Sequence, residues 1–427
     1  MPSRRSSHPK SERTLFRQAF DAALRRPALT VFATALVVRL SALAIVALFS
    51  PPGWIALDDS TYSGLAEQMA SGDARSWSPV LDSLYRSTAT FLVPLTALYW
   101  VFGPVQLLGQ GLVTLVGAAA AAVTSLLARE RVGRGWAFGA GLVVAMLPSQ
   151  VVWSIVLLKD AWVWATSVAL ALVVAVAFRA RGRVLWLTIL GASVLLFLLG
   201  HLRMQSTFAA AWALVLSSVF VPRRRRFAWV GAALAIAVFV PWLAGGGPGG
   251  IDPVLARADN FGEARAAGAV GADSAILAEP PSPSAPGDQP GGSTDRPDAT
   301  NRLVTDLSHL PRGLSVMLLE PYPWDTNRNM RVVFAKIDTI LWYPILGLAL
   351  VGLAQVKNHP RVLVFPTLLG AGMLTGYALA EGNLGTAFRH RGELVWIVAL
   401  LATFGARSLW ERHQAPRDRA TIKPYSA

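Results

Sequence analysis

The sequence lacks cysteine and contains few charged residues. None of its 427 residues is cysteine, which excludes a disulfide framework and thiolate metal sites. Charged residues make up 15% of the chain, whereas soluble domains usually carry about 25%. Apolar residues reach 53%, and the mean hydropathy is +0.45. This composition excludes a soluble enzyme of this length and predicts a membrane protein.

Long apolar segments indicate that the chain crosses a membrane many times. A spanning helix needs roughly 20 mostly apolar residues. The stretch Thr88–Gly103 is shorter and contains Pro94, so we expect it to lie on the outer surface or to re-enter the membrane. Ten other segments meet or approach the required length: 27–49, 105–128, 135–148, 161–178, 184–200, 205–222, 227–243, 337–356, 361–379 and 394–409. We therefore expect an all-α polytopic fold with about ten transmembrane helices.

The distribution of charge predicts the orientation of these helices. Lys and Arg collect in short cytoplasmic loops. If Thr88–Gly103 lies outside, most basic residues, including the run Arg223–Arg226, fall on the cytoplasmic side, and most acidic residues fall outside. Both termini are then cytoplasmic, in a plasma membrane of the bacterial type. The net charge of +14 is explained by topology and by attraction to anionic membrane lipids, so we expect no nucleic-acid partner.

Composition shifts divide the chain into membrane parts and loops. The stretches 245–250 and 279–297 are rich in Gly, Pro, Ser and Asp, which is typical of flexible segments. The expected organisation is a cytoplasmic segment at 1–26, a first membrane part at 27–244 with an outer loop at 50–104, a second outer loop at 245–336 that is flexible to about residue 300, a last membrane part at 337–409 and a cytoplasmic tail at 410–427.

Two adjacent carboxylates open a short helix in the first outer loop. Asp58 and Asp59 precede apolar residues at helical spacing, namely Tyr62, Leu65, Ala66 and Met69. A helix with one apolar stripe, next to a membrane span, is expected to lie flat on the outer leaflet. The carboxylates are then held at the level of the lipid headgroups.

The run Asp58-Asp59-Ser60-Thr61-Tyr62, together with the later outer turn Glu381–Thr386, resembles the GT-C superfamily of membrane glycosyltransferases. The likeness is strongest to family 39 and the aminoarabinose-transferase type, although Asp59 stands where Glu is common. It implies a GT-C-type bundle that transfers a sugar from a polyprenyl-phosphate donor to a lipid or glycan acceptor on the outer side. The resemblance also implies that the reaction is inverting and that Asp58 is the base that deprotonates the acceptor.

Candidate roles for the remaining polar residues follow from the position of each near the outer face. Asp59 orients the acceptor, holds a divalent cation such as Mg²⁺ or Mn²⁺, or caps the helix. Guanidinium groups bind phosphate through two parallel hydrogen bonds, and the strongest cluster is Arg389-His390-Arg391. Interfacial anchoring is the alternative for each cation, and Lys159 is also expected to pair with Asp160. The candidate substrate-binding residues are Tyr62, Arg86, Lys159, Arg203, Asn383, Arg389, His390 and Arg391.

Arg39 lies in the middle of the first predicted span, where a charge is costly and a partner or a function is expected. It either reaches toward the interface or faces the bundle near Asp58, Asp160 or the lipid phosphate.

Two other classes of function remain open: a transporter or flippase of lipid-linked saccharides, and a polymerase or ligase of surface glycans. The gathering of polar residues at one face, without paired repeats, favours an enzyme over a transporter.

Overall fold

The computed structural model describes residues 24–49, 58–72, 88–221, 226–252, 307–326 and 330–421. Every regular element within these ranges is a helix. Arg86, most of the segment predicted to be flexible, the first 23 residues and the last six lie outside the described residues.

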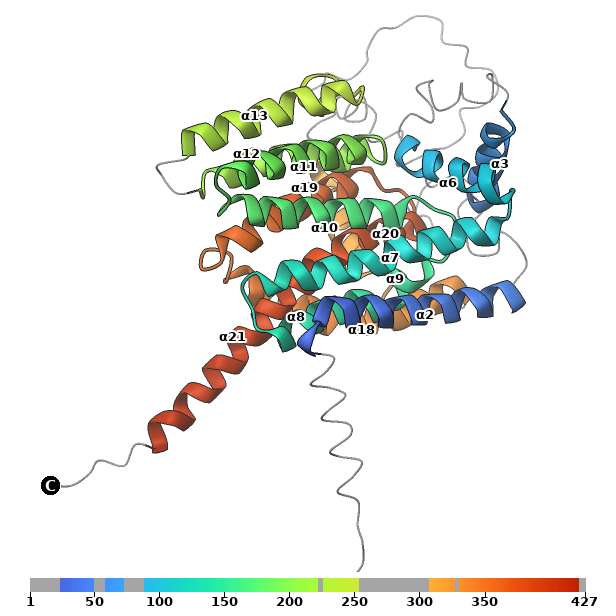
Figure 1. Ribbon diagram of the computed structural model, residues 1–427. Helices are drawn as coiled ribbons and strands as arrows, with labels where there is room; N and C mark the ends of the chain where they lie inside the picture. Colours follow the sequence, from blue (N-terminus) through green and yellow to red (C-terminus); the bar gives the residue numbers. More distant parts are fainter. Residues whose placement is uncertain are drawn as a thin grey trace, which may run out of the picture.

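The helices run side by side in one bundle (Figure 1). Their bounds are α2 Pro27–Phe49, α3 Asp58–Ala70, α6 Ala89–Phe102, α7 Gln106–Arg129, α8 Arg134–Met146, α9 Pro148–Val152, α10 Asp160–Ala177, α11 Arg183–Gly200, α12 Met204–Ser218, α13 Arg226–Leu243, α17 Leu310–Leu319, α18 Met330–Leu353, α19 Pro360–Ala380, α20 Leu384–Arg391 and α21 Val395–Thr421, with short 3-10 turns at Pro248–Gly250 and Gly392–Leu394.

The described helices confirm a multi-pass membrane protein. Seven segments are long and apolar enough to cross a membrane. They correspond to α2, α7, α10, α11, α18, α19 and a last segment that runs from α20 through α21.

Three of the ten predicted spans are not among these seven, so a total of ten is not confirmed. Helix α8 has 13 residues and ends before Pro148, and α12 has 15. In α13 the apolar part covers Trp229–Leu243. The helix in the predicted surface stretch, α6, has 14 residues and continues through Pro94 without a break.

Small residues let the membrane helices approach one another closely. Helix α7 packs against α2, α8 and α10 in the middle of the bundle, and its buried positions include Gly109, Gly117 and several alanines. Where α18 crosses α21, a Cβ atom on Gly352 or Gly405 would lie 2.0 Å from a carbonyl oxygen of the other helix. Contacts of this kind stabilise membrane helices, because lipid provides no hydrophobic driving force between them.

The predicted helix of the first outer loop is α3, and it packs against protein as well as facing outward. Ala66 and Met69 are buried, and the ring of Tyr62 meets Phe91 of α6 edge-on at 5.3 Å. Helix α6 is tied in turn to the end of α11, because the Thr90 hydroxyl donates to the Leu198 carbonyl at 2.9 Å. Helices α3 and α6 therefore form a unit at one end of the bundle (Figure 1).

Loops predicted on the cytoplasmic side meet at the other end. Arg179, after α10, pairs with Glu130, after α7, at 3.0 Å. Arg407 of α21 donates to the carbonyl of Arg131 at 2.9 Å. The structure thus brings together loops that the charge pattern assigns to one side of the membrane.

Candidate functional site

An exposed carboxylate begins a chain of alternating charges that leads into the bundle. The side chain of Asp58, at the start of α3, is 59% exposed and lies 3.3 Å from the guanidinium of Arg389 on α20. Arg389 also binds the buried carboxylate of Asp160, the first residue of α10, at 2.7 Å. Three elements that are distant in sequence are therefore linked by one arginine.

The chain continues through Arg203 to a buried glutamate. Arg203, which immediately precedes α12, lies 3.3 Å from Asp160 and forms an ion pair with Glu393. Glu393 also accepts hydrogen bonds from the hydroxyls of Tyr377 at 2.9 Å and Ser206 at 3.1 Å. Acid and base alternate from Asp58 at the surface to Glu393 in the interior.

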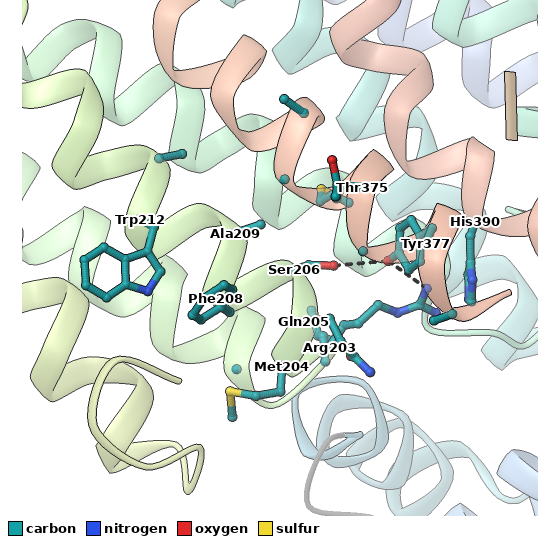
Figure 2. Close-up of a pocket in the computed structure, with 18 of the residues that line it drawn as sticks. Arg203, Met204, Gln205, Ser206, Phe208, Ala209, Trp212, Thr375, Tyr377 and His390 are labelled. Atoms are coloured by element: carbon teal, nitrogen blue, oxygen red, sulfur yellow. Dashed lines mark hydrogen bonds between the residues drawn. The ribbon is translucent and has the colours of Figure 1, made fainter. Parts of the chain in front are cut away.

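The inner part of this chain closes one end of a large open cavity of about 1070 Å³. Most of the cavity wall comes from α12 and α19, with small residues such as Ala209, Ala213, Gly372 and Gly376 facing the space. In Figure 2, Arg203, Ser206, Tyr377 and His390 lie together at one end, with Phe208 and Trp212 farther along α12. The cavity is therefore an apolar groove with a polar end.

The polar end holds basic and acidic side chains in nearly equal numbers. Arg203 and Arg389 face three carboxylates, those of Asp58, Asp160 and Glu393. Lys159 lines the cavity and adds a third cation. Burial, reinforced by the charge of Arg203, lowers the pKa of Lys159 to about 7. The charge at this end therefore changes with the protonation of Lys159 near neutral pH.

His390 lies in the cavity wall in a fixed orientation. Its Nδ1 is 2.6 Å from a carboxylate oxygen of Glu381, and its ring stacks on Tyr377 with centroids 4.6 Å apart. The structure thus places Lys159, Arg203 and His390 in one cavity wall, with Arg389 next to them.

Arg391 faces a different part of the bundle from Arg389 and His390. Its buried guanidinium binds Asp338 of α18 at 3.3 Å and the carbonyl of Glu320 at 3.0 Å, and it lies over the ring of Phe388. Successive residues of a helix point about 100° apart, so three consecutive side chains cannot share one face. Arg391 is therefore separate from the cavity, and its contacts join α20 to α18.

Asp59 is buried and engaged by the protein, in contrast to Asp58. The backbone N–H of Leu157 donates to one carboxylate oxygen at 2.6 Å, and the Gln110 amide donates to the other at 3.1 Å. Burial raises the pKa of Asp59, against the effect of these hydrogen bonds. Among the described residues, no group of three His, Asp or Glu side chains is placed to hold a metal ion. The contacts of Asp59 are those of an anchor for α3.

Two further predicted residues have structural contacts in the described chain. Tyr62 packs on Phe91, as described above. Asn383 caps α20, because its side-chain oxygen accepts the N–H of Gly385 at 2.7 Å. Asn383 therefore fixes the start of the helix that carries Arg389.

Arg39 is buried in the bundle and is surrounded by neutral oxygen atoms. Its Nε donates to the Ser154 hydroxyl at 2.8 Å, and its terminal nitrogens donate to four carbonyls, among them those of Val144 and Ala145 at the end of α8. A cation at a helix C-terminus satisfies carbonyls that have no partner within the helix. Arg39 thus faces the bundle, which was one of the two alternatives predicted from the sequence. That alternative expected Asp58, Asp160 or a lipid phosphate as its partner, whereas the structure shows carbonyl oxygens and the Ser154 hydroxyl.

Sequence reasoning did not identify several members of the charge chain. Asp160 was expected to pair with Lys159, and the structure shows it bound by Arg203 and Arg389. Glu393 and Tyr377 were not predicted at all. The sequence did contain a signal for Glu393, since an acidic residue at the edge of an apolar span normally has a partner or a function.

No protein-family model and no curated protein matches this chain.

Proposed function

We propose that this protein is a membrane glycosyltransferase of the GT-C type that takes a sugar from a polyprenyl-phosphate carrier. The observation that carries the proposal is the groove between α12 and α19, apolar along its length and ending at Lys159 and Arg203. A lipid with one long apolar chain and a phosphate headgroup has the matching distribution of apolar and charged groups.

The length of the groove suits a polyprenyl chain. Its wall includes residues from Met204 to Leu216 on α12 and from Leu368 to Leu379 on α19. At 1.5 Å per residue, each run covers about 17 Å, roughly half the thickness of the hydrocarbon core. A phosphate at the polar end would then lie close to one membrane surface, with the tail directed toward the bilayer centre.

The charge chain supports Asp58 as the base. Asp58 is exposed, and Arg389 connects it to Asp160 beside the cavity. In the proposed step, Asp58 accepts the proton of the acceptor hydroxyl, and that oxygen attacks the anomeric carbon of the donor sugar. The bond from this carbon to the phosphate oxygen breaks, and the phosphate leaves with the electron pair near Lys159 and Arg203. Cations placed there lower the barrier because they stabilise the developing negative charge.

One observation favours a second candidate, a protein that moves a lipid-linked saccharide without reacting with it. Asp58 is absent from the cavity lining, so the lipid site alone does not require a base. A flippase would use the same groove and the same cations.

Substrate binding and turnover distinguish the two candidates. The purified protein in lipid nanodiscs is incubated with polyprenyl phosphates that carry a labelled hexose or pentose and with membranes as the source of acceptor. We expect sugar transfer by the wild type and a loss of at least about 100-fold in Asp58→Asn, the usual lower range for removing a general base. Bound donor without transfer in the wild type favours the flippase, and absence of donor binding contradicts both candidates.

A substitution in the groove tests the lipid site independently of the base. Gly376 lines the cavity, and a Cβ atom on it meets nothing within 4 Å, so Gly376→Leu fills the groove without a backbone clash. Gly347 of α18 is exposed and equally unobstructed, so Gly347→Leu is the matched control. We expect only Gly376→Leu to weaken binding of polyprenyl phosphate. Equal binding by both variants would show that the groove is not the lipid site.

A further inference from the structure

A second polar pocket lies at the opposite end of the bundle from the charge chain. It has a volume of about 100 Å³, and its polar lining comes from Glu130, Arg131, Arg179 and Arg361. These residues stand at three helix ends: α7 ends at Arg129, α10 ends at Ala177 and α19 begins at Pro360. Three helix ends that are far apart in sequence thus contribute one guanidinium each.

Positive charge predominates in this pocket. Arg179 is paired with Glu130 at 3.0 Å. Within the described residues, neither Arg131 nor Arg361 forms an ion pair. The start of α19 adds the positive end of a helix dipole. Three guanidiniums around one carboxylate leave the pocket with a net charge of +2, although like charges at close range repel each other.

The backbone around the pocket is held in place, so the arginines are presented from a defined frame. Arg407 of α21 donates to the carbonyl of Arg131 at 2.9 Å, and Arg407 is itself paired with Glu411 at 2.7 Å. The loop after α7 is therefore fixed to a fourth helix. A defined concave site with two arginines that pair with no carboxylate of the described residues is suited to bind an oxyanion with several acceptor oxygens.

We propose that this pocket binds a phosphate group, and that an anionic membrane lipid supplies it. The site lies beside the ends of apolar helices, where the headgroups of the surrounding leaflet are located. Basic pockets between transmembrane helices on the cytoplasmic side are suited to anionic headgroups, and the charge pattern assigns this end to that side.

Two of the helices that form the pocket, α10 and α19, also extend to the distant cavity, so a bound lipid can stabilise their packing there. Helix α10 has Asp160 at one end and Ala175, in the pocket wall, near the other. Helix α19 runs from Arg361 in the pocket to Tyr377 in the cavity wall. Since 18 residues of helix span about 27 Å, the two sites lie near opposite membrane surfaces. A lipid phosphate that joins these helix ends holds α10, which carries Asp160, against α19, which lines the cavity.

The test measures the affinity of the purified full-length protein for the first bound lipid by native mass spectrometry. The probes are phosphatidylglycerol, zwitterionic phosphatidylcholine and inorganic phosphate. The pocket variant is the double substitution Arg131→Gln and Arg361→Gln. The matched control is Arg181→Gln and Arg183→Gln, two exposed arginines at the same end that do not line the pocket.

We expect phosphatidylglycerol to bind the wild type more tightly than phosphatidylcholine. The pocket variant should lose about 30-fold of this affinity, since each basic residue near an anionic headgroup contributes about fivefold. The control variant should lose clearly less affinity than the pocket variant, because Arg181 and Arg183 do not line the pocket and act only by diffuse attraction. Equal losses in the two variants would overturn the proposal, because they indicate diffuse attraction to the whole basic face. Inorganic phosphate that binds as tightly as phosphatidylglycerol would overturn the assignment to a lipid.

A second measurement applies if the double variant does not fold. The single variants Arg361→Gln and Arg361→Lys are compared by thermal unfolding with and without phosphatidylglycerol. The lipid should stabilise the lysine variant more than the glutamine variant, because lysine retains the charge. Identical stabilisation of the two would contradict the proposal.

Discussion

Replacing Asp59 tests how the first outer loop is attached to the bundle. The Asp59 side chain is 4% exposed in the folded protein, and it accepts the backbone N–H of Leu157 at 2.6 Å. In Asp59→Ala this buried N–H loses its acceptor, at a cost of about 1–3 kcal/mol. We therefore expect the free energy of unfolding to fall by about that amount. The exposed acid Glu67 on the same helix provides the control, and Glu67→Ala should change stability by less than about 0.5 kcal/mol.

A second substitution at the same position separates the hydrogen bond from the charge. Asp59→Asn keeps an oxygen for the Leu157 N–H and removes the ionisable group. Because burial raises the pKa of Asp59 above 3.8, ionisation is less favourable in the folded protein than in the unfolded chain. The stabilising contribution of the carboxyl group is complete below pH 3.8 and is lost as the pH rises through the higher pKa of the folded state. The stability of Asp59→Asn relative to the wild type should therefore increase as the pH rises from 3.8 toward 7.

The assay is unfolding of the purified protein in mixed micelles by increasing amounts of dodecyl sulfate, followed by tryptophan fluorescence at several pH values. Wild-type stability in Asp59→Ala would contradict the role of this carboxylate as an anchor for α3. A difference between Asp59→Asn and the wild type that stays the same at every pH would contradict the raised pKa of Asp59.

Three further predictions concern other buried charges. Glu393→Ala removes the inner partner of Arg203, and the same assay should show a loss of about 3–5 kcal/mol, as for other broken buried ion pairs; a loss below 1 kcal/mol would argue against a closed charge chain. Arg39→Lys supplies three donors to five acceptors, so we expect a loss of about 1–3 kcal/mol, and full stability in this variant would contradict the role as a carbonyl cap. With a pKa of about 7, Lys159 is charged mainly below neutral pH. The affinity of the wild type for polyprenyl phosphate should therefore fall by about tenfold from pH 6 to pH 8, relative to the affinity of Lys159→Arg. Parallel pH profiles of the two proteins would disprove this.

Much of the membrane fold follows from apolar length, and the departures have physical reasons. The seven candidate spans coincide with segments that carry enough consecutive apolar residues to cross the bilayer. Helix α8 ends at Met146, two residues before the end of its predicted span, because Pro148 removes a backbone donor and the chain breaks at Leu147 before the next short helix. Pro94, by contrast, lies inside α6 without ending it. The position of proline alone did not indicate which of the two would occur.

The candidate site was only partly predictable because its partners are distant in sequence. The apolar spacing in 62–69 predicted the amphipathic helix on which Asp58 and Asp59 lie. Nothing local indicates that Asp59 would turn toward the Leu157 N–H while Asp58 stays exposed. Arg389 and Arg391 carry the same charge two residues apart, yet helical rotation directs them to Asp160 and Asp338 respectively.

The proposed function requires that the groove between α12 and α19 holds the carrier lipid. The most direct measurement is crosslinking of a photoreactive polyprenyl phosphate to the wild-type protein in nanodiscs, followed by identification of the labelled peptides. The proposal predicts labels on α12 and α19, at residues such as Phe208 and Met373 that line the cavity, and their loss when unlabelled polyprenyl phosphate competes. Labels confined to the lipid-facing sides of α2 or α18, with no effect of the competitor, would contradict it.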